Sequence, residues 1–242
     1  MNICLFNSDE INRPLLKNDE RAKHIIKVLH KSCGDSFDAG IIGGAAGSAT
    51  ITGISENGDI SFSFEPKSAG KKLYPLTLII GFPRPIQLRR LLRDVAGLGV
   101  EKVILCGTDL TEKSYLDSNV VSDGSAYQML LDGTAQAAST HVPQLEVAKS
   151  LDEVMEVEIE NASKIALDNR RSTCSLHDFL NQESALSVIA AIGSERGWTE
   201  RERDLLENAG FTLCSMGKRI LRTETAATVA SSIILDSMGF LN

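Results

Sequence analysis

Two glycine-bearing segments near the end of the chain combine residue types that could bind a ligand and act on it. The first follows an apolar run, and Gly193 and Gly197 allow its backbone to turn tightly and approach a ligand. The second contains Gly217, followed by the basic pair Arg219 and Arg222. A guanidinium stays charged and offers several donors in a rigid fork, which suits a phosphate or a developing anion. Spacing alone leaves open that both segments are ordinary strand-to-helix turns.

Several other kinds of site lack the residues they need. The five cysteines are scattered and never in CxxC spacing, and the four histidines form no HExxH pair, so we expect neither disulfides nor a bound metal. The absence of GxGxxG disfavours a nicotinamide or flavin enzyme. A net charge of −7 argues against a protein that coats nucleic acid by charge alone, although grouped basic residues could still bind structured RNA.

The length and composition are those of a globular protein. With 242 residues, 43% of them apolar, the chain can bury one large core or two modest ones. No apolar run approaches the ~20 residues needed to span a bilayer. The first residues, MNICLFNSDE, lack the basic region and apolar stretch of a signal peptide. We therefore expect a cytoplasmic protein with no membrane segment.

The first third of the chain predicts short strands around one helix. The helix is expected over residues 19–30, with Asn18 or Asp19 as its N-cap and Gly34 beyond its end. Strands are expected at 36–39, 49–55 and 59–64. Residues 1–70 thus predict a small β-barrel domain, and residues 67–72 predict a linker.

From Tyr74 onward, predicted strands alternate with predicted helices. The strands are expected at 76–81, 103–106, 163–167, 187–192 and 211–215. The helices are expected at 86–98, 124–138, 200–208 and 224–238. Thr199 and Glu202 predict a capping box for the third of these, and Thr223 is expected to cap the last. The alternation is typical of a parallel sheet with crossover helices, whose ligands bind at the carboxyl ends of the strands.

Residues 192–230 closely resemble the carboxyl-terminal motifs of the RsmE family of ribosomal RNA uridine N3-methyltransferases, in the SPOUT superfamily. That family reads, roughly, I-G-P-E-G-G-[FW]-[ST]-x-x-E, then a G-[FY] turn, then S-L-G-x-R-I-L-R-x-E-T-A. The matching residues here are Ile192-Gly193-Ser194-Glu195-Arg196-Gly197-Trp198-Thr199, then Gly210-Phe211, then Ser215-Met216-Gly217-Lys218-Arg219-Ile220-Leu221-Arg222-Thr223-Glu224-Thr225-Ala226.

Two shorter matches extend the resemblance over essentially the whole chain. RAKHIIKVL at 21–29 resembles the H-x-x-x-V-L element of the family's PUA-like barrel, and GLGV at 97–100 resembles its E-L-G-V turn. The chain departs from the family at Ser194 and Arg196, where proline and glycine are usual. Arg196 could either crowd the cofactor pocket or point outward and touch RNA.

The resemblance implies a fold, a cofactor and partners. The fold would be α/β, with a PUA-like, RNA-binding β-barrel over 1–70 and a SPOUT domain with a deep trefoil knot over 74–242. The cofactor would be S-adenosyl-L-methionine (SAM), without a metal. The substrate would be small-subunit (16S) ribosomal RNA or the assembled 30S particle, and the site would be completed in a homodimer. The implied cofactor residues are Leu167, Ile192, Gly193, Ser194, Glu195, Gly197, Ser215, Met216, Gly217, Ile220, Leu221 and Thr225.

Methylation at N3 of a uridine places its own demand on the catalyst. Uracil N3 carries a proton at neutral pH, so the site must favour its loss and stabilise charge on the neighbouring carbonyl oxygens. As a hypothesis, Arg222 steadies uracil O2 or O4, and Arg219 holds phosphate or ribose. Glu224 would orient Arg222 or the cofactor. The alternative is that Arg222 and Glu224 pair with each other only to hold the fold.

Basic side chains on two predicted helices, and one just before the second helix, are candidates for contact with RNA phosphates. These are Arg21, Lys23, Lys27, Arg84, Arg89, Arg90 and Arg93. A solvated helix face is the competing explanation. The last predicted helix carries more apolar residues than one sheet face requires, which indicates a homodimer contact or, alternatively, burial within one chain. A monomer at micromolar concentration would contradict the dimer.

Two other functions remain open at this point. The chain could be a knotted methyltransferase that acts on tRNA or on a ribose 2′-hydroxyl. It could also be an inactive RNA-binding factor of ribosome assembly, a class suggested by Ser194, Arg196 and the acidic total.

Overall fold

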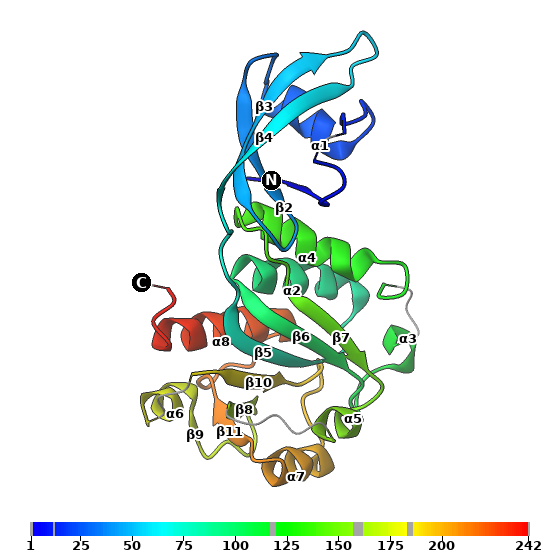
Figure 1. Ribbon diagram of the computed structural model, residues 1–242. Coiled ribbons are helices and arrows are strands. Elements are labelled where there is room, and N and C mark those ends of the chain that lie inside the picture. The colour runs from blue at the N-terminus through cyan, green and yellow to red at the C-terminus, as the bar shows by residue number, and fades with distance from the viewer. Residues whose placement is uncertain (1, 12, 117–119, 157–161, 183–185, 242) are drawn as a thin grey trace. The chain divides into compact units, whose positions relative to one another are not determined.

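The computed structural model describes residues 2–11, 13–116, 120–156, 162–182 and 186–241 (Figure 1). The chain divides into two compact units. The first comprises Met1–Lys72 together with Asp132–Val142, and the second comprises Leu73–Leu131 and Pro143–Asn242. The sequence carries no signal that residues 132–142 return to the first unit.

The first unit contains a four-stranded sheet in the order β1-β2-β3-β4. The strands are β1 (Cys4–Phe6), β2 (Ser36–Ile41), β3 (Ala46–Ile54) and β4 (Ile60–Ser68). β1 is parallel to β2 and the other pairs are antiparallel. Phe6, Phe37 and Phe62 pack together in its core, with ring centroids 4.9 and 6.1 Å apart. The three strands expected from the sequence are present, and β4 runs into the segment expected to be a linker.

The expected helix of the first unit has two parts. α1 (Glu20–Lys23) begins after Asp19, whose side chain accepts a hydrogen bond from the backbone N–H of Arg21. It continues as a π-helical turn, η1 (His24–Val28). The predicted Asp19 cap is therefore confirmed, and the predicted helix is present but turns π-helical after Lys23 and ends at Val28 instead of residue 30. His30 has a φ of +52°, which ends the helical path.

The second unit contains a seven-stranded, wholly parallel sheet in the order β7-β6-β5-β10-β8-β11-β9. The strands are β5 (Tyr74–Gly81), β6 (Val100–Cys106), β7 (Gln144–Ala148), β8 (Ser163–Leu167), β9 (Cys174–Ser175), β10 (Val188–Ile192) and β11 (Thr212–Ser215). The helices that start in this unit are α2 (Pro85–Gly97), α3 (Lys113–Leu116), α4 (Ser125–Gln136), α5 (Leu151–Met155), α6 (Leu176–Gln182), α7 (Glu200–Asn208) and α8 (Thr223–Ser237). The predicted α/β fold with a parallel sheet is confirmed.

Helices cover both faces of this sheet (Figure 1). α5 and α7 pack on one face, where Trp198 and Leu206 join a cluster that includes Ile79 and Ala166. α2 and α8 lie on the other face and contact each other, with Thr228 donating to Asp94 at 3.2 Å. In the part of the chain that is described, no helix is long and apolar enough to cross a membrane.

The sheet order brings the expected ligand-binding segments together. From β5 the chain moves outward through β6 and β7, whereas β10 and β8 lie on the opposite side of β5. This reversal is a topological switch point, where parallel sheets open a crevice at the carboxyl ends of their strands. The loops after β8, β10 and β11 start from neighbouring strands and therefore meet there.

Candidate functional site

A cavity of about 650 Å³ lies at the carboxyl ends of β8, β10 and β11. Three loops form its wall, namely residues 167–170, 192–197 and 216–221, which we call the first, second and third loops. α7 adds Arg203, and α8 adds Thr223 and Ala226. The volume falls within the range of about 300–1,000 Å³ that is usual for small-molecule sites.

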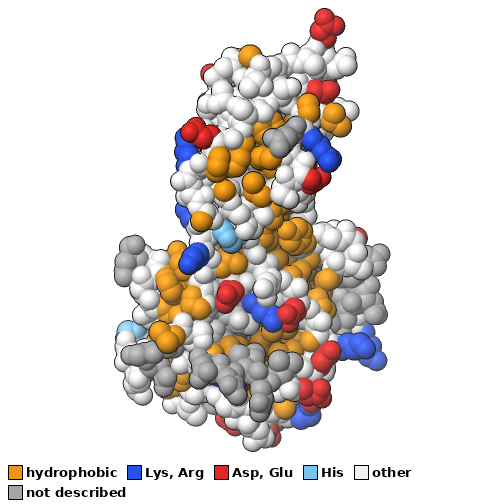
Figure 2. All heavy atoms as spheres, in the orientation of Figure 1, with side chains coloured by type: hydrophobic (Ala, Val, Ile, Leu, Met, Phe, Trp, Pro, Cys, Tyr) orange, Lys and Arg blue, Asp and Glu red, His pale blue; other side chains and the backbone are white. Residues whose placement is uncertain are grey.

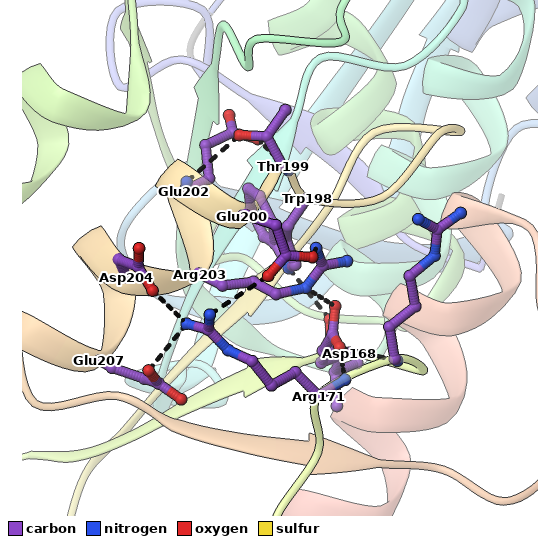
Figure 3. Close-up of polar contacts among 11 residues, drawn as sticks. Asp168, Arg171, Trp198, Thr199, Glu200, Glu202, Arg203, Asp204 and Glu207 are labelled. Atoms are coloured by element: carbon purple, nitrogen blue, oxygen red, sulfur yellow. Dashed lines mark hydrogen bonds and ion pairs between the residues drawn. The ribbon is translucent and has the colours of Figure 1, made fainter.

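The first loop is held by buried polar contacts (Figure 3). Trp198, 2% exposed, donates from Nε1 to the carbonyl of Leu167 at 3.0 Å. The Asp168 carboxylate accepts from Nε of Arg203 at 2.8 Å and from the backbone N–H of Arg170 at 2.8 Å. The backbone N–H of Asp168 donates to the carbonyl of Cys214 at 2.9 Å, which joins the loop to β11.

The second loop makes a tight turn that depends on its glycines. The backbone N–H of Gly197 donates to the carbonyl of Ser194 at 2.9 Å, with Gly197 at a φ of +74°. A Cβ at Gly193 would lie 3.0 Å from the Gly197 backbone, and a Cβ at Gly81 would lie 2.5 Å from the Ser194 nitrogen. The side chain of Glu195 accepts from the backbone N–H of Arg84 at 3.1 Å.

The third loop leads into α8, and here one expectation is wrong. Thr223 is the first residue of α8, and the N-cap position belongs to Arg222, which makes no side-chain capping bond. The Thr223 hydroxyl donates instead to the carbonyl of Gly193 at 3.3 Å, because the third loop lies against the second. The capping box predicted for Thr199 and Glu202 is confirmed.

Most residues that the resemblance assigns to the cofactor line the cavity. These are Leu167, Ile192, Gly193, Ser194, Glu195, Gly197, Met216, Gly217, Ile220 and Leu221. Ser215 and Thr225 do not: the Ser215 hydroxyl donates to the carbonyl of Cys174 at 3.5 Å, and Thr225 is exposed on α8. The cavity also involves Asn169 and Arg203, which the sequence reasoning missed because neither lies in a motif.

The expected catalytic residues occupy three different environments. Arg219 lines the cavity and is exposed, whereas Arg222 is exposed outside its wall. Neither arginine forms an ion pair with another described residue, so the alternative that Arg222 and Glu224 pair to hold the fold is not seen. Glu224 is 5% exposed, and its Oε2 has no hydrogen-bond partner among the described residues.

Arg196 takes the outward one of its two expected orientations. Its guanidinium Nη2 lies 3.6 Å from Oε1 of Glu112, and the side chain is 66% exposed. The residue lines the cavity, but because its side chain points outward, the space between the loops stays open.

The predicted RNA-contacting residues differ in how freely they can meet a phosphate. Arg89, Arg90 and Lys27 are exposed, whereas Arg93 is half-buried. Arg84 donates to the Tyr115 hydroxyl at 3.0 Å, and Lys23 pairs with Glu20. Among the described residues on the face drawn in Figure 2, basic side chains lie singly or in small groups, several of them near acidic ones.

Arg21 is committed to contacts within the first unit. Its guanidinium pairs with Glu10 and Asp19, both at 2.7 Å, and donates to the carbonyl of Leu5 at 2.9 Å. Hydrogen bonds from Arg21 hold the pKa of both carboxyls below their ordinary values. These partners satisfy the donors that a phosphate would need, so we leave Arg21 out of the proposed RNA surface.

α8 buries most of its apolar side within one chain. Ala227, Ala230 and Ile234 are fully buried, while Ile233 is 36% exposed. This matches the competing explanation for those residues, and the homodimer stays a prediction. Among the described residues, no group of three or more potential metal ligands is present.

Comparisons with known proteins agree over nearly the whole chain. The model of the RNA methyltransferase domain family matches residues 70–235. The ribosomal RNA small subunit methyltransferase E of Treponema pallidum is 40% identical over 97% of this chain and 91% of its own. The ribosomal RNA small subunit methyltransferase E 1 of Borreliella burgdorferi is 32% identical over 98% of both chains.

Solved structures with lower identity share the fold. A ribosomal RNA small subunit methyltransferase E from Neisseria gonorrhoeae, bound to S-adenosyl methionine, has a TM-score of 0.79 at 20% identity, over 98% of this chain and 97% of that one. A probable rRNA-methyltransferase from Porphyromonas gingivalis has a TM-score of 0.81 at 20% identity, over 99% and 100%. With 40% identity along almost its full length, and a matching family model, the chain belongs to the ribosomal RNA small subunit methyltransferase E family of RNA methyltransferases.

Proposed function

We propose that this protein uses SAM to methylate N3 of a uridine in 16S ribosomal RNA. The observation that carries the proposal is the cavity, because two of the three loops in its wall, the second and the third, hold the family motifs. The names of the relatives, at 40% and 32% identity, support small-subunit ribosomal RNA as the substrate. The position of the methyl group on uridine N3 rests on the motif resemblance.

The residues around the cavity fit SAM. Gly193 and Gly197 bring main-chain groups to the wall, and a Cβ at Gly217 would meet no atom within 4 Å, so its backbone faces open space. We propose that ten of the expected residues, those that line the cavity, hold the cofactor. When bound, SAM supplies a methyl carbon activated by the adjacent sulfonium. The task left to the chain is to bind the uracil, promote loss of its N3 proton and exclude water.

Arg222 and Arg219 are our candidates for that task. Both are exposed and form no ion pair with described residues, so their guanidinium donors are available to an RNA substrate. We assign Arg222 to the uracil carbonyl oxygen and Arg219 to a phosphate or ribose, since charge that develops on O2 or O4 is stabilised by fixed donors. Glu224, buried two positions after Arg222, would orient Arg222 or the cofactor.

Two finer features of the fold are also part of the proposal. We infer that the second unit contains the trefoil knot, and that the first unit is a PUA-like barrel that contacts RNA. Support for the knot comes from the third loop, which lies against the second through Thr223, and from β11, which is joined to the first loop through Cys214. Support for the barrel is the bridge between Leu15 and Ile60, which adds a pairing beyond the four strands.

The function is tested by nucleoside analysis of small-subunit ribosomal RNA. We expect RNA from cells that lack the protein to lose 3-methyluridine, and purified protein with SAM to restore it on isolated small subunits. If the protein instead methylates tRNA or a ribose hydroxyl, the proposed substrate or position is wrong. Wild-type protein that does not bind SAM in calorimetry would instead indicate an inactive assembly factor.

Arg89 and Arg90 are expected to contribute contacts to RNA phosphates. Both lie exposed on α2, whose buried residues Leu88, Leu91 and Leu92 hold the helix against the sheet. Each phosphate contact changes the slope of log K against log salt by about 0.7 to 0.9. Replacing both arginines with glutamine should therefore make the slope shallower by up to about 1.8.

The slope is obtained from RNA dissociation constants measured at a series of salt concentrations from low to moderate. Lys102→Gln is the matched control, because Glu146 lies 2.7 Å from the Lys102 ammonium and already neutralises it. An unaltered slope in the double arginine variant would place the RNA on another surface.

A further inference from the structure

Ion pairs join α7 to the segment that begins with the first loop, and each of the two contributes an arginine. α7 extends Arg203 to Asp168 in the loop, and the segment extends Arg171 back to α7 (Figure 3). Arg171 pairs with Asp204 at 2.7 Å and with Glu207 at 2.8 Å, on the exposed side of the helix. Glu200 lies between the two arginines, 2.8 Å from Arg203 and 3.2 Å from Arg171.

The inner pair is buried and borders the cavity. The side chains of Arg203 and Asp168 are each 3% exposed, and both residues line the cavity. Asp168 uses one carboxylate oxygen for Arg203 and the other for the backbone N–H groups of Arg170 and Arg171. The orientation of one carboxylate thus sets both the turn of the loop and its distance from α7.

A buried ion pair is a weak source of net stability, because desolvation offsets most of the attraction between its members. Two apolar side chains would serve the core about as well. Unlike apolar contacts, the pair fixes direction, since the guanidinium Nε and the carboxylate must align. When a loop at the wall of a cavity is already fixed, the ligand does not have to order it, so the entropic cost of binding is lower.

We propose that Arg203 is a positioning residue for SAM, which acts through Asp168 to hold the backbone of residues 167–170 in the shape that receives the cofactor. The inference rests on the proposed function, since it assumes that SAM occupies the cavity. It assigns a role in cofactor binding to the core-facing side of α7, outside the three loops that form most of the cavity wall.

The competing role for Arg203 is direct contact with the cofactor carboxylate. Two ligands separate these roles: SAM, and 5′-methylthioadenosine, which lacks the amino-acid carboxylate. A displaced loop weakens both ligands by the same factor, whereas loss of a direct contact to the carboxylate weakens SAM alone.

The experiment measures both dissociation constants by calorimetry for Arg203→Met, Asp168→Asn and the double variant. Arg201→Met is the matched control, because Arg201 lies on the same helix and also pairs with two carboxylates, Asp109 and Asp152, away from the cavity wall. We expect Arg203→Met to weaken both ligands equally, by about tenfold or more. Arg201→Met should leave both unchanged.

The double variant tests whether Arg203 acts through Asp168. If it does, Asp168→Asn should add little once Arg203 has been replaced, because the interaction is already lost. Fully additive effects, wild-type affinity in Arg203→Met, or a loss confined to SAM would each overturn the proposal. If Arg203→Met does not fold, Arg203→Lys replaces it: a single ammonium cannot align with both Asp168 and Glu200 as the fork does, so the same equal weakening is expected.

A second measurement needs no ligand. Amide hydrogen exchange at residues 168–172 should be faster in Arg203→Met than in wild-type protein, while the amides of β5 and β10 keep their protection. Unchanged exchange in the loop would contradict the positioning role. Because this readout does not depend on SAM, it separates failure of the inference from failure of the proposed function.

Discussion

Replacing Arg222 with alanine is expected to lower the turnover of methyl transfer by about 10²–10³-fold, with SAM affinity unchanged. Arg222 is exposed and outside the cavity wall, so removing its side chain takes nothing from the cofactor site. It makes no side-chain capping bond at the start of α8, so the helix should not lose stability either. The loss should fall on kcat, because a group that stabilises charge only in the transition state contributes little to ground-state binding.

The rate of methyl transfer is measured under single-turnover conditions on isolated small ribosomal subunits. SAM affinity is measured separately by calorimetry. Arg222→Lys should fall between the wild type and the alanine variant, since an ammonium keeps the charge but lacks the planar fork. Arg201→Ala is the control for the loss of an exposed arginine in the same unit. Unchanged turnover in Arg222→Ala would remove this residue from the catalytic role.

Gly81→Ala is expected to weaken SAM binding by about 10²-fold, although residue 81 does not itself line the cavity. The new Cβ would lie 2.5 Å from the Ser194 nitrogen and 3.0 Å from the Gly193 carbonyl carbon. Both are backbone atoms, so the second loop has to move as a whole to admit the methyl group. Overpacking of this kind should also lower the free energy of unfolding by about 1–3 kcal/mol.

Calorimetry with SAM and chemical denaturation measure the two effects of Gly81→Ala. Gly97→Ala is the matched control: it adds the same methyl group in the same unit, where no atom lies within 4 Å. In the last turn of α2 this change should keep SAM affinity and leave stability unchanged or raise it by about 0.5–1 kcal/mol. A Gly81→Ala protein that binds SAM like the wild type would show that the second loop does not shape the site.

Local patterns in the sequence determined most of the elements of the second unit. Leu88, Leu91, Leu92 and Val95 predicted α2 by their helical spacing, and all four are fully buried. The short elements escaped prediction. β7 (Gln144–Ala148) is an edge strand with exposed residues and therefore has no continuous apolar run, and β9 has only two residues.

The sequence by itself determined where the chain turns and which motif residues could face a ligand, since both depend on neighbours within a few positions. Only the tertiary structure decided how those turns are held. Asp168 meets Arg203 across 35 positions, and Gly81 meets the second loop because β5 and β10 are neighbours in the sheet. Ser215 and Thr225 match the motif but lie outside the cavity, and Arg21 is enclosed by Glu10 and Asp19. Such contacts depend on strand order and burial, which no local spacing encodes.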